Sequence, residues 1–190
     1  SSNSLIIEDD YLYVLTGAGL EIYSIENNGD LELISRYSID WAIAFVKHED
    51  NLFFLRYQTL EDCSEVYRIN VSNPYNPHLN GIISHNQQEP ESWTRPEALF
   101  IINNLLYFSQ WDAPGQNKID YFYDPVNLEL VQQHENLFLV NTVNENTAIR
   151  GTAPYMYEVY DFSNIAEPEH IYTFDGQEYL TNSYPMQNFY

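Results

Sequence analysis

One pattern of apolar runs and short polar turns recurs about four times along this 190-residue chain. Each copy is marked by an acidic or Asn-containing turn between two apolar runs. These turns are residues 8–10, 49–51, 103–104 and 144–146. They follow one another at steps of about 40, 54 and 41 residues, which is the period of a four-stranded propeller blade. Such a unit cannot bury its own apolar face, so neighbouring units must stack to form a core. The sequence therefore predicts an all-β fold, a β-propeller of four to five four-stranded blades.

The repeat divides the chain into four blades and a terminal segment within a single domain, residues 1–190. The predicted blades comprise residues 4–37, 41–84, 97–133 and 137–174. Residues 179–190 are predicted either to close the propeller against the first blade or to begin a fifth blade. In the second case the chain is a fragment of a longer propeller. The strand expected to pair within the chain or between copies is formed by Pro185, Met186, Gln187, Asn188, Phe189 and Tyr190.

The charge balance excludes several classes of partner. Lys and Arg number 7 against 28 Asp and Glu, which gives a formal net charge of −21. Nucleic-acid phosphates and anionic membrane surfaces are repelled by such a field. No stretch approaches the roughly 18 apolar residues that would indicate a transmembrane helix, so we expect no membrane insertion. The single cysteine, Cys63, excludes an intrachain disulfide and any zinc site built from several cysteines.

Motifs for catalysis and for a resident cofactor are absent from the sequence. There is no Gly-x-Ser-x-Gly elbow, no closely spaced His pair and no Asp-x-Asp-x-Asp-Gly calcium loop. We therefore predict no cofactor. Short carboxylate groups such as residues 8–10 and 61–62 leave a calcium site open as an alternative. With 28 acidic residues, a pair of carboxylates suited to glycoside hydrolysis can be neither identified nor excluded.

Aromatic and polar residues in the two long loops are the candidate binding residues. Trp93 and Arg95 lie in the polar segment of residues 85–96, which accounts for most of the long 54-residue step. Gln110, Trp111 and Asp112 lie at the start of the loop of residues 110–117. Exposed Trp beside hydrogen-bonding groups suits stacking on a sugar or gripping a peptide. The alternative for Trp111 is that it ends a strand and packs between blades.

Two segments, residues 65–79 and 157–168, share a run of alternating apolar and aromatic residues followed by a Ser-Asn turn with proline. A third, residues 11–23, keeps the front half of the pattern, and the third blade matches only loosely at residues 124–127. This pattern resembles the LVIVD repeat of bacterial and archaeal surface and secreted proteins. Ser24 and Asn70 depart from it, since the family usually has Asp there. The resemblance implies a β-propeller outside the cytoplasm and carries no catalytic residues to transfer.

The sequence and the resemblance together favour a non-enzymatic interaction or structural module of the LVIVD propeller type. We expect it to be extracellular or on the cell surface and to bind a protein or a glycan, or other copies of itself through the terminal strand. The alternative is a carbohydrate hydrolase or lyase that uses carboxylates in the propeller channel, which rests on analogy with other propellers.

Overall fold

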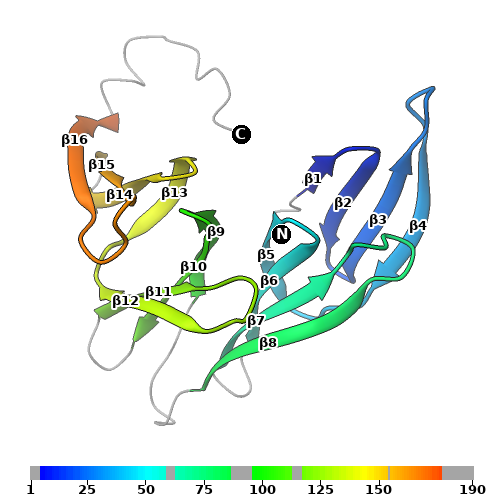
Figure 1. Ribbon diagram of the computed structural model, residues 1–190, viewed down its shortest axis with the longest axis horizontal. Helices are drawn as coiled ribbons and strands as arrows, with labels where there is room; N and C mark the ends of the chain where they lie inside the picture. Colours follow the sequence, from blue (N-terminus) through cyan, green and yellow to red (C-terminus); the bar gives the residue numbers. More distant parts are fainter. Residues whose placement is uncertain (1–4, 59–62, 87–95, 113–116, 154, 177–190) are drawn as a thin grey trace. The chain divides into compact units, whose positions relative to one another are not determined.

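The computed structural model describes residues 5–58, 63–86, 96–112, 117–153 and 155–176, which form four sheets of four strands each (Figure 1). The first sheet consists of β1 (Leu5–Glu8), β2 (Tyr11–Thr16), β3 (Gly19–Ile25) and β4 (Leu31–Tyr37). The second consists of β5 (Ala42–His48), β6 (Asn51–Gln58), β7 (Cys63–Asn70) and β8 (His78–Asn86). The third consists of β9 (Pro96–Ile102), β10 (Leu105–Asp112), β11 (Asn117–Tyr123) and β12 (Leu130–Glu135). The fourth consists of β13 (Leu139–Asn144), β14 (Thr147–Ala153), β15 (Met156–Asp161) and β16 (Glu169–Asp175).

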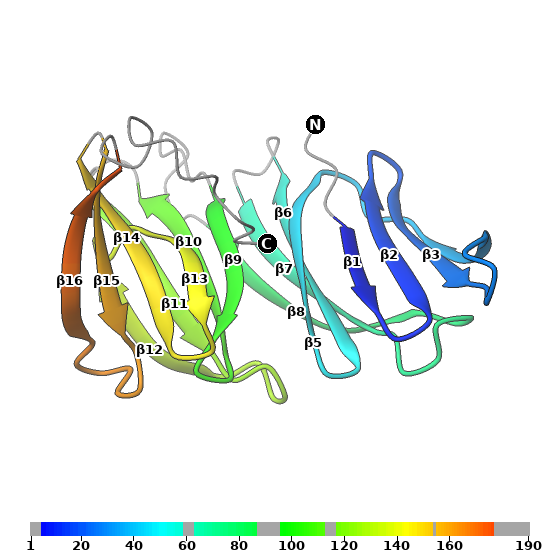
Figure 2. The same cartoon turned by 90° about the horizontal axis from the view of Figure 1, so that it is seen from above.

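Within every sheet the strands lie side by side in the order in which they follow one another in the chain (Figure 2). Each sheet is therefore an up-and-down antiparallel meander, which is the arrangement of a propeller blade. The predicted all-β fold and its four-stranded repeat are confirmed.

The chain forms two compact units, Ser1–Leu99 with Gln110–Gln116 and Phe100–Ser109 with Asn117–Tyr190. The first unit contains the first and second sheets, and the second contains the fourth sheet and most of the third. Each is described by itself below. The single domain and the blade boundaries expected from the sequence stay predictions.

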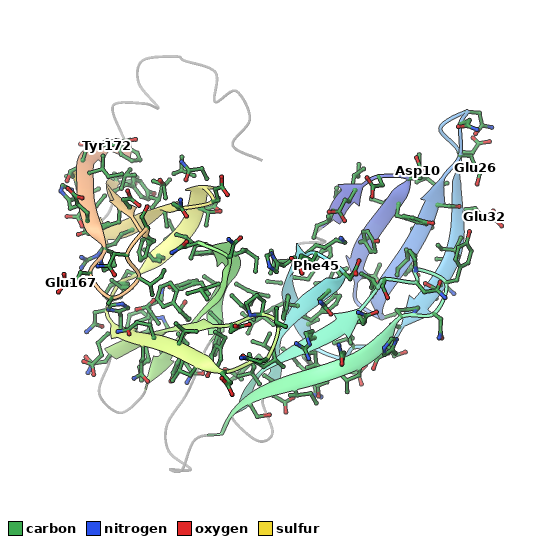
Figure 3. The ribbon with its side chains drawn as sticks, viewed as in Figure 1. Asp10, Glu26, Glu32, Phe45, Glu167 and Tyr172 are labelled. Atoms are coloured by element: carbon green, nitrogen blue, oxygen red, sulfur yellow. The ribbon has the colours of Figure 1, made fainter. Side chains whose placement is uncertain are left out.

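The core of the first unit lies between the first and second sheets. Tyr13, Leu15 and Ile22 of the first sheet pack in one buried cluster with residues of the second. Phe45, labelled in Figure 3, belongs to that cluster and stacks on Phe54 with ring centroids 5.4 Å apart. Polar contacts at the margins add to this packing. The Ser35 hydroxyl donates to the Pro74 carbonyl at 2.6 Å, and Lys47 forms an ion pair with Glu8.

Aromatic packing joins the third and fourth sheets of the second unit. Phe122 lies 5.9 Å from Phe162, centroid to centroid, and meets the His134 ring edge-on. The Nε2 of His134 donates to the carbonyl of Ile165 at 2.8 Å. Asn103 in the β9–β10 turn donates from its side-chain amide to the Phe162 carbonyl at 3.0 Å. Blades in this unit are thus joined by side chains of the third sheet that reach the end of β15.

Three of the four turns that mark the sequence repeat contain residues in the left-handed backbone conformation. Asp9, Glu49, Asn103 and Asn104 all have φ between 47° and 56° and connect the first two strands of their sheets. Asn and Asp enter this region more easily than other non-Gly residues. This backbone requirement explains why the polar turns recur at a fixed place in the repeat.

The Ser-Asn turns of the second and fourth sheets make matching hydrogen bonds. The side-chain oxygen of Asn70 accepts from both the amide and the hydroxyl of Ser72, at 3.2 and 2.6 Å. The Oδ1 of Asp161 accepts the same pair from Ser163, each at 2.7 Å, and these bonds lower the pKa of Asp161. An Asn or Asp followed two residues later by Ser therefore closes the same turn in both copies.

A register irregularity recurs between the third and fourth strands of all four sheets. It falls at Ile22/Tyr23, Tyr67/Ile69, Phe122/Tyr123 and Val159/Tyr160. Such bulges bend a strand and increase its twist, which makes an outer edge a poor template for pairing with another chain. Strand addition at the outer edges is therefore disfavoured in every blade.

Candidate functional site

The densest group of buried polar side chains lies in the third sheet. Tyr107 on β10 donates its hydroxyl hydrogen to Oδ1 of Asp120 on β11. The other carboxylate oxygen of Asp120 accepts from the backbone amide of Leu137 at 2.8 Å. Lys118 is 2% exposed, and its Nζ lies 5.5 Å from the centroid of the Phe138 ring. Tyr107 and Asp120 are both fully buried.

The same group fastens the connection between the third and fourth sheets. The Lys118 amide donates to the side-chain oxygen of Asn136 at 3.0 Å, and the Asn136 amide donates to the Lys118 carbonyl at 2.7 Å. Since Asp120 holds Leu137, two successive residues of this connection are bound to β11. We call Tyr107, Asp120 and Lys118, together with the amide of Leu137, the Asp120 cluster.

Burial shifts the pKa of both acids in the Asp120 cluster. Loss of hydration raises the pKa of Asp120, while the hydrogen bonds from Tyr107 and Leu137 and the charge of Lys118 act in the opposite direction. Burial also raises the pKa of Tyr107 well above its usual value, and the carboxylate beside it adds to that rise. Both carboxylate oxygens of Asp120 accept hydrogen bonds from the chain. The cluster is therefore suited to holding two sheets together.

The other three sheets carry a different polar group, an Arg that bonds to a Glu-x-Tyr pair. In the second sheet, one guanidinium nitrogen of Arg56 donates to the Glu65 carboxylate and to the Tyr67 hydroxyl, each at 2.9 Å. The Arg56 guanidinium also lies 5.5 Å from the centroid of the Tyr67 ring. The carboxylate and the hydroxyl both stand on β7, two residues apart and hence on one face.

Equivalent groups occur in the first and fourth sheets. Arg36 donates to Glu21 at 2.9 Å, and the Tyr23 hydroxyl donates to the same carboxylate at 2.7 Å. In the fourth sheet, Arg150 lies 3.6 Å from Glu158, which also accepts from the Tyr160 hydroxyl at 3.0 Å. These Arg–Glu–Tyr groups were not predicted. The signal was present, because Glu21-Ile-Tyr23, Glu65-Val-Tyr67 and Glu158-Val-Tyr160 repeat the same spacing.

The face of the first sheet that points away from the second is apolar. Directly paired residues of antiparallel strands point to the same side, so the register places the members of this face together. Its apolar residues are Leu5, Ile7, Leu12, Val14, Leu31 and Leu33. Leu5 and Ile7 on β1 are 63% and 64% exposed, and Leu31 on β4 is 53% exposed. We call this surface the outer face of the first sheet.

The outer face also holds one of the Arg–Glu–Tyr groups. Glu21 pairs with Val14 and with Arg36, and Tyr23 pairs with Leu12 and Leu33. A sheet with one solvated face normally alternates apolar and polar residues along its strands. The first two strands, with sequences LIIE and YLYVLT, are apolar on both faces. They have the composition of strands covered on both sides, yet the outer face is exposed.

The candidate binding residues of the two long loops are only partly described. Trp93 and Arg95 lie outside the described residues. Gln110 is buried near the end of β10, and Trp111 beside it is half-buried. Asp112 ends the strand. The binding role of these five residues stays a prediction.

The terminal strand of residues 185–190 lies outside the described residues, and its role in assembly stays a prediction. In the described ranges, no three His, Cys, Asp or Glu side chains are grouped so that they could hold a metal ion. A calcium site stays an alternative prediction from the sequence. In the same ranges, no helix has the length and hydropathy needed to cross a membrane.

Comparison with known proteins gives likeness at the level of fold. No family model matches the sequence, and no curated protein matches it. Among solved structures, the chain is similar to a protein from Lactobacillus plantarum, with 12% identity and a TM-score of 0.63 over 90% of this chain and 54% of that one. It is also similar to Sqt1 from Saccharomyces cerevisiae, with 10% identity and a TM-score of 0.56 over 90% of this chain and 49% of that one.

The chain thus spans about half the length of these two solved structures. At such low identity the likeness concerns the fold alone. The four antiparallel four-stranded sheets place this protein among those built from β-propeller blades.

Proposed function

We propose that this chain is a non-enzymatic interaction module of the β-propeller type that binds a protein partner through the outer face of the first sheet. The observation that carries the proposal is the exposure of Leu5 and Ile7, on a strand whose composition is that of a covered sheet, beside exposed Leu31 on β4. Large contiguous apolar surfaces on folded proteins are typical of sites for protein or membrane partners. The net charge of −21 disfavours an anionic membrane.

A protein partner fits this face better than a glycan. Leu, Ile and Val side chains offer aliphatic contact area, whereas sugar rings are usually gripped by exposed aromatic rings beside hydrogen-bonding groups. A glycan would be expected at Trp93 and Trp111 in the long loops, as the sequence predicts. One molecule can bind a glycan through its loops and a protein through its outer face. Of these two sites, the outer face is the one that the described residues support.

The alternative of a carbohydrate hydrolase or lyase stays a prediction that no observation favours. It requires two carboxylates that flank a glycosidic bond. The buried carboxylate with a raised pKa, Asp120, accepts hydrogen bonds at both oxygens and is fully buried. The extracellular or cell-surface location and the relation to LVIVD repeats are part of the proposal and are supported by the sequence resemblance.

A displayed random-peptide library tests the proposed binding surface. The library is selected on the immobilised wild-type chain, and each recovered peptide is then measured against the double variant Leu5→Asp/Ile7→Asp. Val126→Asp serves as the control, because Val126 is 70% exposed in a turn of the third sheet and lies off the outer face. We expect recovered peptides to bind the double variant at least tenfold more weakly and to bind the control unchanged.

Two results would overturn this proposal. One is recovery of peptides that bind the double variant and the wild type equally well. The other is a glycan array on which the wild type binds sugars with an affinity that Trp111→Ala lowers, while the peptide library yields nothing. That pattern would move the binding site to the loops.

A further inference from the structure

We infer that the partner of the outer face is a second copy of this chain, which covers the face with its own fourth sheet. This inference rests on the proposed function and names its partner. Two observations support it: how the equivalent face of the second sheet is covered, and which residues the fourth sheet presents.

The second sheet shows what covers a face of this kind. Its Arg–Glu–Tyr group, Arg56 with Glu65 and Tyr67, stands on the same side as Phe54 and Leu52, as the pairing of β6 with β7 requires. That side packs against the first sheet in the buried cluster of the first unit. A blade face with an Arg–Glu–Tyr group and aliphatic neighbours is therefore covered there by another blade of the same repeat.

The first sheet covers the second with residues that have counterparts in the fourth sheet. Tyr11 pairs with Ser24 and Thr147 pairs with Asp161, and both pairs lie next to the hairpin turn between the first two strands. Counting from these pairs, the covering residues Tyr13, Leu20 and Ile22 of the first sheet correspond to the following residues of the fourth: Ile149, Tyr157 and Val159. Val159 is 2% exposed, while Ile149 and Tyr157 are half-buried. The fourth sheet therefore offers Ile149 and Tyr157, at the same register, to cover a face like that of the first sheet.

Aromatic side chains enlarge that surface of the fourth sheet. Phe174 on β16 stacks on Tyr157 with centroids 5.4 Å apart, and Tyr172 lies beside Phe174 at 6.0 Å. Tyr172 pairs with Val159, so it points to the same side, and its side chain is 52% exposed (Figure 3). Exposed Tyr at an apolar surface is a common anchor of protein interfaces.

In a pair related by a two-fold axis, the first sheet of each copy meets the fourth sheet of the other, so the outer face of each copy becomes covered.

Charge makes a distinctive prediction about this association. Each copy carries −21, so the two copies repel one another at low ionic strength. Added salt screens that repulsion over distances of about 10 Å at 0.1 M, while the apolar contact persists. Association is therefore expected to strengthen with salt, in contrast to assemblies held by complementary charges.

Light scattering behind size exclusion tests the inference, at several protein concentrations and at 0.05 and 0.5 M salt. We expect a mass of about 45 kDa, twice the 22.3 kDa of one chain, with more dimer at the higher salt. Leu5→Asp/Ile7→Asp and Tyr172→Asp should each give the single-chain mass, and Val126→Asp should leave the dimer intact. Because the two variants damage opposite sides of one contact, an equimolar mixture of them should regain part of the dimer.

Fluorescence of the neutral dye Nile red on the same samples separates two kinds of failure. A single-chain mass with dye binding that Leu5→Asp/Ile7→Asp abolishes would overturn the second copy and leave the proposed function standing. A single-chain mass without dye binding would overturn both, since the face would then be covered. A dimer that survives either variant would also overturn the inference, because the contact would lie elsewhere.

Discussion

The third sheet and the other three sheets differ in where they place their polar side chains and in how those side chains are paired. The first, second and fourth sheets each join an Arg to a Glu-x-Tyr pair at partly solvated positions. The third sheet has no such motif in its third strand and instead buries Tyr107, Asp120 and Lys118 completely or nearly so. The backbone meander is the same in all four. A repeat therefore specifies its strands and turns, while each copy sets the environment of its polar side chains independently.

The difference teaches which polar groups stabilise the molecule most strongly. Exposed ion pairs contribute little, because water competes for both partners and salt screens them. A buried group that loses its partner carries the full cost of its lost hydration. We therefore expect the third sheet to be sensitive to substitution of its polar residues and the other sheets to be tolerant.

The largest effect is expected from Asp120→Ala. This change leaves the buried Tyr107 hydroxyl and the Leu137 amide without the carboxylate that accepts their hydrogen bonds, and each unsatisfied buried donor costs about 1–3 kcal/mol. The free energy of unfolding measured by urea titration checks it. A loss no greater than that caused by Glu158→Ala would remove the contrast between the sheets.

Tyr107→Phe should have the next largest effect. It removes one hydrogen-bond donor and keeps the ring that stacks on Phe100 at 4.3 Å. Asp120 keeps its bond from Leu137, so we expect a loss of about 1–3 kcal/mol in the free energy of unfolding. Phe100→Leu is a useful companion variant, since it disturbs the ring packing and leaves the hydrogen bond in place. If Tyr107→Phe lowers the free energy of unfolding equally at low and high salt, the result agrees with a buried interaction that salt does not screen.

The Arg–Glu–Tyr groups should give smaller and graded effects. Arg56→Ala removes a partly buried guanidinium that bonds two groups and lies over an aromatic ring, and about 1 kcal/mol is expected after allowance for solvent screening. The Arg36 side chain is 68% exposed, and its removal should leave the free energy of unfolding unchanged within error. If Arg36→Ala costs as much as Arg56→Ala, exposure does not decide the strength of these groups.

A further small effect is the pH dependence that Asp120 contributes. Its pKa is raised in the folded protein, so the folded state holds the proton more tightly than the unfolded chain does. Asp120 therefore contributes most stability below its ordinary pKa of 3.8, and that contribution is lost as the pH rises through the raised folded value. The effect is small because hydrogen bonds and Lys118 oppose the effect of burial.

Comparison of the wild type with Asp120→Asn isolates this pH dependence. The difference in free energy of unfolding between the two proteins should favour the wild type most at acidic pH and shrink toward neutrality. A difference that instead grows with rising pH would mean that the pKa of Asp120 is lowered by its partners.

Much of the fold could be predicted from the sequence because it depends on local rules. The polar turns at Asp9, Glu49 and Asn103 mark places where the chain needs a left-handed residue, and they recur at the blade period. The Asn70–Ser72 and Asp161–Ser163 turns likewise follow from short-range hydrogen bonds. The outer-strand bulges were not predicted, because an extra residue in one strand has no signature in a sequence of alternating side chains.

The candidate sites were harder to predict because they depend on contacts between distant residues. Gln110 and Trp111 were expected to form a binding site, and their position at the end of β10 leaves one buried and the other half-buried. The Arg–Glu–Tyr groups had a visible signal in the repeated Glu-x-Tyr spacing, but the Arg comes from β4 in one sheet and from the second strand in the others. Only the strand register brings the three side chains together.

The sequence by itself determined the all-β class, the four-stranded repeat and the acidic net charge, because side-chain periodicity, turn chemistry and composition can be read without knowing which sheets pack together. Tertiary structure decided that Asp120 is buried and shared between Tyr107 and Leu137, and that the outer face of the first sheet remains exposed. Whether a side chain is buried depends on which sheets pack together. The same apolar pattern therefore forms a core on one side of the first sheet and an exposed apolar face on the other.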